Sequence, residues 1–149
     1  MVIRELTAGE CRDFLARTRL MRLACARHDQ PYIVPIHVDW DGDCLYGYAT
    51  LGQKIEWMRE NPLVCLESDT VVSDGEWTSV VVFGRYEELP ATFQYVEARS
   101  IAERLFQRHP GWWEPASVPV GAEEPRTRIV FRIRISLATG RRAGPSTVT

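Results

Sequence analysis

The sequence predicts a mainly β protein, built as a six-stranded antiparallel barrel with flanking helices. Six short apolar or alternating runs are separated by turn signals. Most successive runs are joined by hairpin-length connections rather than by helices, which disfavours a parallel nucleotide-binding sheet. With 149 residues, of which 45% are hydrophobic and 26% charged, the chain is long enough for one domain with an ordinary core.

The first half of the chain predicts two short helices with three strands between them. Thr7 and Glu10 have the spacing of a capping box, so the first helix begins there and ends near Arg19. Turns are expected at residues 29–31 and 41–43. The three strands cover residues 20–28, 32–40 and 44–50, and the second helix covers residues 53–61, before Pro62.

The second half predicts two further strands and the longest helix. A strand over residues 63–69 and a turn at 73–75 lead into a strand over 78–89, in which Gly84 indicates a bulge or sharp bend. A helix follows over about 91–108, and an irregular segment reaches Pro125. The apolar stripe expected on that helix consists of Phe93, Val96, Ile101, Leu105 and Phe106.

The last strand has the clearest alternation in the chain. Ile129, Phe131, Ile133 and Ile135 alternate with Arg128, Val130, Arg132 and Arg134. The pattern predicts that the first set faces the core and the arginines face outward. Small and polar residues follow Thr139, so we expect one domain over residues 1–139 and a disordered tail over 140–149.

Composition excludes several classes of protein. Charges stand in the N-terminal segment where a signal peptide needs an apolar stretch, and no apolar run is long enough to cross a membrane. We therefore expect a cytoplasmic protein without a membrane partner. The four cysteines form no Cys-x-x-Cys and no close Cys/His pair, so we expect reduced core thiols and no metal site.

Charge is distributed unevenly along the chain. All 20 acidic residues precede position 125, whereas six of the 18 basic residues follow it, so residues 125–149 carry +6 and residues 1–124 carry −8. A basic end can bind nucleic acid, but the outer face of the last strand accounts for the same pattern. Because a basic surface helix and an aromatic stacking motif are lacking, we expect no nucleic-acid partner.

The histidines and the single lysine are the remaining candidates for chemistry. No Gly-x-Ser-x-Gly motif is present, and His37 lies within a predicted strand, where a structural histidine is the simpler interpretation. Lys54 is the only lysine of the chain and follows Gly52 at the start of the predicted helix 53–61. Free N–H groups and the helix dipole favour an anion there, and an ammonium group suits a phosphate.

The order of these segments resembles a known superfamily. The resemblance extends from about Leu15 to Leu89, over RLACARHDQPYIVPIHVDWDGDCLYGYATLGQKIEWMRENPLVCLESD and WTSVVVFGRYEEL, and continues more weakly through HPGWWEP and the last strand. On these residues the chain resembles the pyridoxamine 5'-phosphate oxidase-like flavin-binding split-barrel superfamily, and in particular its nitroimidazole-resistance-like branch.

The resemblance implies a split β-barrel of Greek-key type that works as a homodimer, with flavin in clefts between the protomers. FMN is the implied cofactor, and FAD is the alternative. The resemblance also implies the positions of the contacts. The isoalloxazine ring and ribityl chain would lie along Val34, Pro35, Ile36 and His37, and the ribityl and phosphate region would be lined by Tyr48, Ala49 and Thr50. The phosphate would be held by Gln53 and Lys54, and the ring would be reached from the second protomer by Trp77 and Ser79.

Two departures from the family pattern and one pair of tryptophans bear on function. Tyr48 stands where relatives often carry a histidine, and Gln53 stands where many carry an arginine beside the phosphate-site lysine. The missing charge could come from Arg22, Arg59 or Arg85. Trp112 and Trp113 could form a lid on the substrate side of the cleft, or else a core plug and an interface anchor.

Two functions therefore remain open. The first is a flavin-dependent oxidoreductase that takes electrons from NAD(P)H or another donor and passes electrons or hydride to a small planar acceptor. His37 and Tyr48 are its candidate proton donors. The second is a flavin carrier, store or sensor without turnover. Bleaching of the bound flavin by NAD(P)H distinguishes the two.

Overall fold

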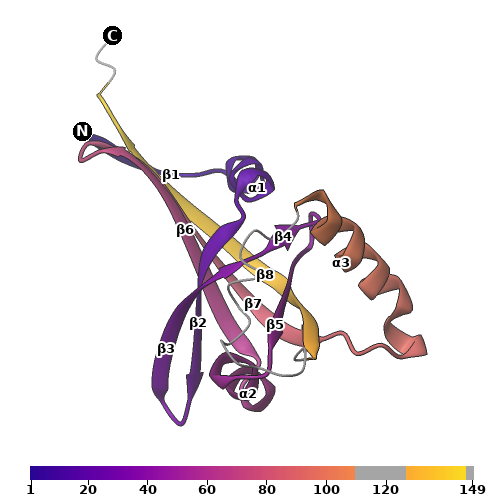
Figure 1. The fold of residues 1–149 in the computed structure, drawn as a ribbon. Coiled ribbons are helices and arrows are strands. Elements are labelled where there is room, and N and C mark those ends of the chain that lie inside the picture. The colour runs from indigo at the N-terminus through magenta and orange to yellow at the C-terminus, as the bar shows by residue number, and fades with distance from the viewer. Residues whose placement is uncertain (110–126, 147–149) are drawn as a thin grey trace, which may run out of the picture.

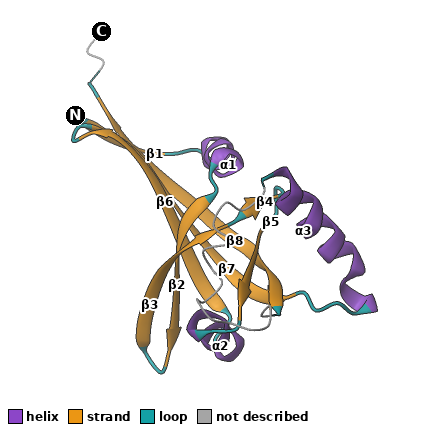
Figure 2. Cartoon of the chain, in the orientation of Figure 1, coloured by secondary structure: helices purple, strands orange, loops and turns teal. Residues whose placement is uncertain are grey.

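In the described part of the chain, eight strands form one antiparallel sheet, in the order β3-β2-β6-β7-β8-β5-β4, with β1 paired to the end of β8. The computed structural model describes residues 1–109 and 127–146 (Figures 1 and 2). The strands are β1 Val2–Glu5, β2 Leu20–Arg27, β3 Gln30–His37, β4 Asp39–Trp40, β5 Cys44–Thr50, β6 Leu63–Ser73, β7 Glu76–Glu88 and β8 Arg128–Gly144. The helices are α1 Ala8–Arg17, α2 Gln53–Glu60 and α3 Val96–Arg108, the last preceded by a 3-10 turn at Phe93–Tyr95.

The sheet curls into a barrel that stays open along one seam. β3 pairs only with β2 among the described residues, whereas β4, the next strand in the chain, pairs with β5. The single strand expected over 32–40 is thus divided at Val38, whose N–H donates to the carbonyl of Arg19 (2.8 Å). The consequence is a split barrel in which β3 is an edge strand beside an incompletely closed gap.

The barrel interior forms the main hydrophobic core. Residues from β2, β6, β7 and β8 that point inward are fully buried, and α2 closes one end of the barrel with Ile55 and Met58. Figure 1 shows α2 at the end of the barrel opposite the chain termini. Phe131 lies so close to Gly47 that a Cβ atom there would be 2.8 Å from the ring, which explains the glycine within β5.

A second, smaller core lies between α3 and the outer face of β5 and β8. It consists of Cys44, Tyr46, Leu89, Ala98, Ala102, Phe106 and Val130. Val130 was expected to face outward with the arginines, and it is buried because α3 covers that face. The predicted stripe of α3 was also partly wrong, because Phe93 is 96% exposed and the buried side of the helix is Ala98, Ala102 and Phe106.

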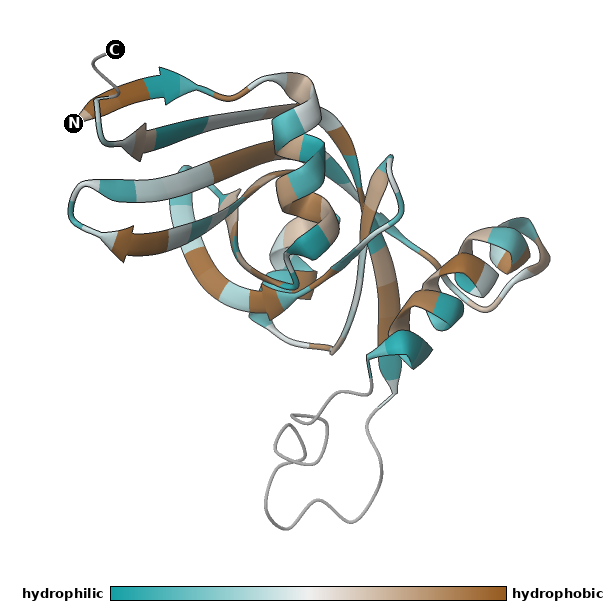
Figure 3. Cartoon of the chain, turned by 90° about the horizontal axis from the view of Figure 1, so that it is seen from above, coloured by the Kyte–Doolittle hydropathy of each residue, from teal (hydrophilic) through white to brown (hydrophobic). Residues whose placement is uncertain are grey.

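The predicted N-terminal helix is confirmed together with its capping box. The Glu10 N–H donates to Thr7 Oγ1 (3.2 Å), and the Thr7 N–H donates to Glu10 Oε2 (2.9 Å). Two backbone N–H groups at the start of α1 thereby have hydrogen-bond acceptors. Figure 3, which colours the chain by hydropathy, shows apolar and polar residues on α1 and α3, as expected of amphipathic helices.

Two predicted turns differ in their outcome. Gly42 has a φ of +111°, and Asp41 accepts hydrogen bonds from the N–H groups of Asp43 and Cys44, so the turn at 41–43 is confirmed. The other turn lies at His28 and Asp29, with φ values of 49° and 63°, rather than at 29–31. Pro31 already belongs to β3 and pairs with Ala26.

The disordered tail predicted over 140–149 is wrong for residues 140–144. β8 continues to Gly144, because β7 pairs with it as far as Ala143 and β1 pairs with residues 141–144. β1 itself was not predicted. Both errors have one cause, because these short polar segments become strands through pairing with each other rather than through their own periodicity. The irregular segment expected over 112–125 lies outside the described residues.

Candidate functional site

Edge strand β3 carries the first predicted group, Val34 to His37. Side chains alternate along a strand, and here Val34 and Ile36 pack on the barrel core while Pro35 is exposed on the outer face. Only the backbone of Val34 and Ile36 is therefore available to a ligand. Because β3 has one strand neighbour in the described sheet, the N–H and C=O groups along its other edge can meet the polar rim of a planar ligand.

His37 ends β3 at the point where the seam of the barrel begins. Burial lowers the pKa of His37, and the positive charge of Arg19 lowers it further against the opposing effect of Asp39. The imidazole is therefore neutral at physiological pH, with one ring nitrogen as donor and the other as acceptor. A neutral imidazole can exchange hydrogen bonds with a bound ligand, but it is a weak proton donor at neutral pH.

Tyr48 on β5 points toward α3. Its ring meets Phe106 edge-on at a centroid distance of 4.9 Å, and the guanidinium of Arg128 lies 4.6 Å from the Tyr48 centroid. Ala49, the next residue, packs on the barrel core instead. The predicted group of Tyr48, Ala49 and Thr50 is thus divided between the two faces of β5.

Lys54 lies in the first turn of α2, next to Gln53. The lysine is half-buried, and desolvation lowers the pKa of its ammonium group. No carboxylate of the described residues lies within 4.0 Å of it, whereas Arg59 on the same helix pairs with Glu88. Glycine at the N-cap leaves the first N–H groups of α2 without a side-chain cap. These groups form a compact cationic site suited to a phosphate.

Three arginines elsewhere in the chain could supply the positive charge that Gln53 lacks, and they have different environments. Arg22 is bound to Glu67 (3.2 Å) and to Asp69 (2.8 Å), and Arg59 is bound to Glu88. Arg85 is exposed and has no ion pair within residues 1–109 and 127–146. Of the three, Arg85 is the one whose charge is not already balanced by a described carboxylate.

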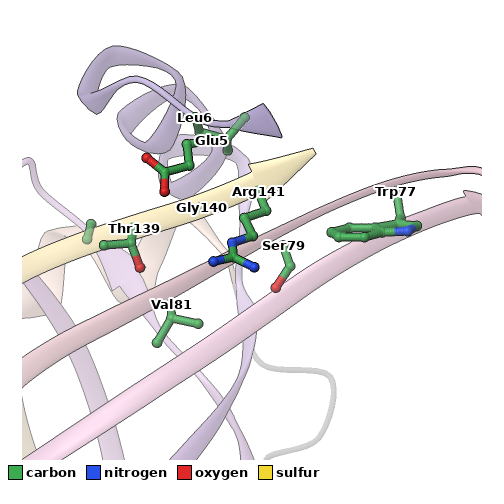
Figure 4. Close-up of a pocket in the computed structure, with 9 residues that line it drawn as sticks. Glu5, Leu6, Trp77, Ser79, Val81, Thr139, Gly140 and Arg141 are labelled. Atoms are coloured by element: carbon green, nitrogen blue, oxygen red, sulfur yellow. The ribbon is translucent and has the colours of Figure 1, made fainter. Parts of the chain in front are cut away.

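Trp77 and Ser79 line a pocket of about 460 Å³ formed by residues of β1, β7 and β8 (Figure 4). The pocket is lined by Glu5, Leu6, Trp77, Ser79, Val81, Ala138, Thr139, Gly140 and Arg141. Figure 1 places the β6–β7 turn, which precedes Trp77, near the N-terminus and α2 at the opposite end. The structure therefore does not bring Trp77 and Ser79 together with Lys54 within one chain.

Three residues of this pocket with polar side chains were missed from the sequence. Glu5 lies in β1, and Thr139 and Arg141 lie at or beyond the predicted end of the domain. A signal was present, because Arg141 and Arg142 interrupt an otherwise small and uncharged segment, but their strand partners cannot be read from the sequence. Trp112 and Trp113, the predicted lid residues, lie outside the described residues.

An apolar row crosses the outer face of five strands. Its members are register partners from strand to strand: Ile33, Ala24, Cys65, Phe83 and Leu137. Ile33 is 64% exposed, Phe83 45% and Leu137 54%. Large apolar side chains aligned in this way are typical of a surface that another molecule covers. We call this set the outer apolar row.

Comparison with known proteins assigns the fold to a family. The model of the family described as pyridoxamine 5'-phosphate oxidase matches residues 7–142. This chain belongs to that family. The match extends to Arg142, which agrees with a domain that includes the end of β8 rather than stopping at residue 139.

Individual relatives cover nearly the whole chain. An uncharacterised protein of Rhizobium meliloti (strain 1021) is 43% identical over 146 residues, covering 96% of this chain and 97% of the relative. The crystal structure of an FAD-binding protein from Mesorhizobium loti is 40% identical, with a TM-score of 0.81 and coverage of 97% and 100%. A candidate 5-nitroimidazole antibiotic resistance protein from Bacteroides thetaiotaomicron shares the fold at 15% identity, with a TM-score of 0.66 and coverage of 97% and 93%.

These similarities confirm the split-barrel fold and the superfamily expected from the sequence. The predicted strand number was six, and the structure has eight because β1 and the two-residue β4 are added. No helix of the described residues is long and apolar enough to span a membrane.

Proposed function

We propose that this protein binds flavin and works as a flavin-dependent oxidoreductase. The observation that carries the proposal is Lys54, a partly desolvated cation at an uncapped helix start without a carboxylate partner among the described residues. A cation kept without its own counter-ion is stabilised by a bound anion. In a split barrel with an exposed strand edge, a flavin phosphate is the anion that we propose.

The flavin we propose is FAD. The sequence favoured FMN with FAD as the alternative, but the Mesorhizobium loti protein, 40% identical over 97% of this chain, is an FAD-binding protein. Gln53, which removes one positive charge from the site beside Lys54, also fits a cofactor with further contacts elsewhere. FMN lacks the adenylate of FAD, so it has no further contacts to compensate for the missing charge.

The proposed cleft uses the residues that the resemblance implied, with roles adjusted to their orientation. Val34 and Ile36 offer backbone groups along the edge of β3, and Pro35 and His37 offer side chains. Thr50, Gln53 and Lys54 form the phosphate end. Trp77 and Ser79 reach the flavin from the partner protomer, because they belong to the start of β7, next to the β6–β7 turn, which lies at the end of the sheet opposite α2 within one chain (Figure 1).

The outer apolar row supports the proposal that the protein is a homodimer. Two copies related by a two-fold axis bury the same surface on each chain, which removes Phe83 and Leu137 from water in both. The clefts then lie between protomers. The exposed β3 edge of one chain faces the pocket of the other.

The bound flavin supplies the hydride and electron chemistry. The protein holds the flavin phosphate with Lys54 and offers hydrogen bonds to the ring from the β3 backbone and the neutral His37. Tyr48 is held against Phe106 and Arg128, so we assign it a packing role rather than that of a proton donor. NAD(P)H is the proposed donor, and a small planar molecule is the proposed acceptor.

A carrier, store or sensor of flavin is the second candidate function. The orientation of Tyr48 favours it, since this residue stands where relatives often carry a histidine and its ring contacts α3. In either case the proposed location is the cytoplasm, where the four free thiols stay reduced. Nucleic acid is not a proposed partner, because Arg128, Arg132 and Arg134 on β8 are paired with Glu103 and Glu87.

The test is a visible absorption spectrum of the purified protein, with mass analysis of the cofactor released by heat. We expect a flavin spectrum and the mass of FAD. Anaerobic addition of NADH or NADPH should bleach the spectrum, and a planar acceptor should restore it. Flavin that no donor reduces would favour the carrier, and a colourless protein that takes up neither FAD nor FMN would refute both functions.

A further inference from the structure

We infer that the pocket lined by Glu5, Trp77, Ser79, Thr139 and Arg141 binds the adenosine 5'-phosphate half of FAD. We call it the β7–β8 pocket. The inference rests on the proposed flavin function and specifies which part of the cofactor this pocket receives. Its volume of about 460 Å³ lies within the range of small-molecule sites.

The pocket lies where β8 has a strand neighbour on one side only. β5 pairs with β8 as far as Arg134, and β1 pairs with it from Arg141 onward. Between these two positions β8 pairs only with β7 in the described sheet. The pocket is lined by residues from the end of β1, from β7 and from β8 (Figure 4).

Arg141 is the cation of this pocket. β8 carries five arginines, and the other four pair with carboxylates: Arg128 with Glu103, Arg132 and Arg134 with Glu87, and Arg142 with Glu10. Arg141 has no ion pair within the described part of the chain, although Glu5 is its register partner. A guanidinium whose charge is not balanced within its own chain is suited to a phosphate.

The remaining groups match the sugar and the base. Glu5 is the partner of Arg141 across β1 and β8, and a carboxylate at such a site accepts hydrogen bonds from ribose hydroxyls. Trp77 lines the pocket and is only half-buried, so the accessible part of its indole can stack on a purine. The hydroxyls of Ser79 and Thr139 add polar contacts, although the Ser79 hydroxyl already donates to Glu67 (3.0 Å).

These groups fit an adenylate better than the isoalloxazine ring that was expected next to Trp77 and Ser79. The ring carries no phosphate for Arg141, and a carboxylate such as Glu5 opposes the negative charge that a reduced flavin acquires. The adenylate half supplies a phosphate for Arg141, a ribose for Glu5 and a base for Trp77. Since the β7–β8 pocket and Lys54 lie at opposite ends of the chain, the pocket of one protomer takes the adenylate of an FAD whose other phosphate meets Lys54 of its partner.

The experiment compares FAD and FMN binding to apoprotein of Arg141→Gln by flavin fluorescence quenching. We expect FAD affinity to fall roughly 10- to 100-fold, as for loss of a charge-assisted hydrogen bond. FMN affinity should stay unchanged, because FMN lacks the adenylate. Arg142→Gln is the matched control, since Arg142 points to the opposite face of β8 and contacts Thr78 and Glu10. It should leave both affinities unchanged.

Trp77→Leu provides a second variant with the same expected selectivity. An equal loss of FMN and FAD affinity would place the flavin ring in the pocket and overturn the inference, as would unchanged FAD affinity in both variants. If the variants lost affinity for ADP-ribose while the ratio of their FAD and FMN affinities stayed unchanged, the pocket would be assigned to a nicotinamide dinucleotide. That result would likewise overturn the inference. A wild-type protein that binds neither flavin would refute the proposed function first.

Discussion

Gly84 on β7 lies so close to Arg134 on β8 that a Cβ atom on the glycine would be 2.5 Å from the arginine carbonyl oxygen. The pairing register of β7 and β8 shifts at this point, between Phe83 and Gly84. The sequence-based expectation of a bulge at Gly84 is thereby confirmed. The bulge changes which residues of β8 point outward, so that Leu137, Thr139 and Arg141 share the outer face with Phe83, Val81 and Ser79.

Gly84→Ala should destabilise the protein by about 1–3 kcal/mol, because the added methyl group meets backbone that cannot rotate away. Urea denaturation followed by circular dichroism measures the change. Gly144→Ala is the control, since a Cβ atom there meets nothing within 4 Å. Equal stability of the two variants would contradict the close contact.

Lys54→Ala should weaken flavin binding by about 1.5–3 kcal/mol, through loss of a charge-assisted phosphate contact. Arg59→Gln, on the same helix but paired with Glu88, should have no effect on affinity. Because desolvation lowers the pKa of Lys54, the wild-type affinity should decrease as pH rises through that lowered pKa and the ammonium loses its proton. The alanine variant should not show this decrease. Fluorescence titrations at several pH values test both statements, and unchanged affinity in Lys54→Ala would place the phosphate elsewhere.

Phe83→Asp should convert the proposed dimer to a monomer and weaken the proposed flavin binding, because the outer apolar row then carries a charge. Phe93→Asp is the control. Phe93 is 96% exposed at the start of the α3 region and is not part of the row. Size-exclusion chromatography with light scattering gives the oligomeric state. Dissociation of both variants, or of neither, would show that the row is not the interface.

Glu10→Gln should make folding stability less sensitive to acid. Hydrogen bonds from Arg4 and from the Thr7 N–H lower the pKa of Glu10 from 4.5 to about 2. A carboxyl with a lowered pKa in the folded state stabilises the protein above its unfolded pKa, and this contribution is lost as pH falls from about 4.5 to about 2. The wild type should therefore lose more stability across this window than the variant.

Denaturation midpoints measured between pH 2 and pH 5 test the role of Glu10. Glu97→Gln serves as the control, because Glu97 is an exposed carboxylate in the first turn of α3 without an ion pair in the described part of the chain. It should follow the wild-type curve. A Glu10→Gln curve parallel to the wild type would show that the contacts of Glu10 do not contribute.

The resemblance predicted which segments form the site, but it did not predict which way their side chains point. Val34 to His37 belong to the edge strand β3 and Lys54 to the first turn of α2, and that these residues bind flavin stays a prediction. Tyr48 could not be oriented from the sequence, because the strand assignment does not tell which face of β5 the helix α3 covers. Arg141 and Glu5 were missed because their pairing joins residues more than a hundred positions apart.

By itself, the sequence determined what depends on local chemistry. The capping box of α1, the turn at Asp41 to Asp43, the glycine at the bulge and the alternation of the central strands all act through neighbours in the chain. Tertiary structure alone decided the rest: that β8 extends to Gly144, that α3 buries Val130, and that Arg141 faces Ser79 in a pocket. These features depend on backbone pairing and burial between distant segments, whose free energy appears only when the whole barrel is assembled.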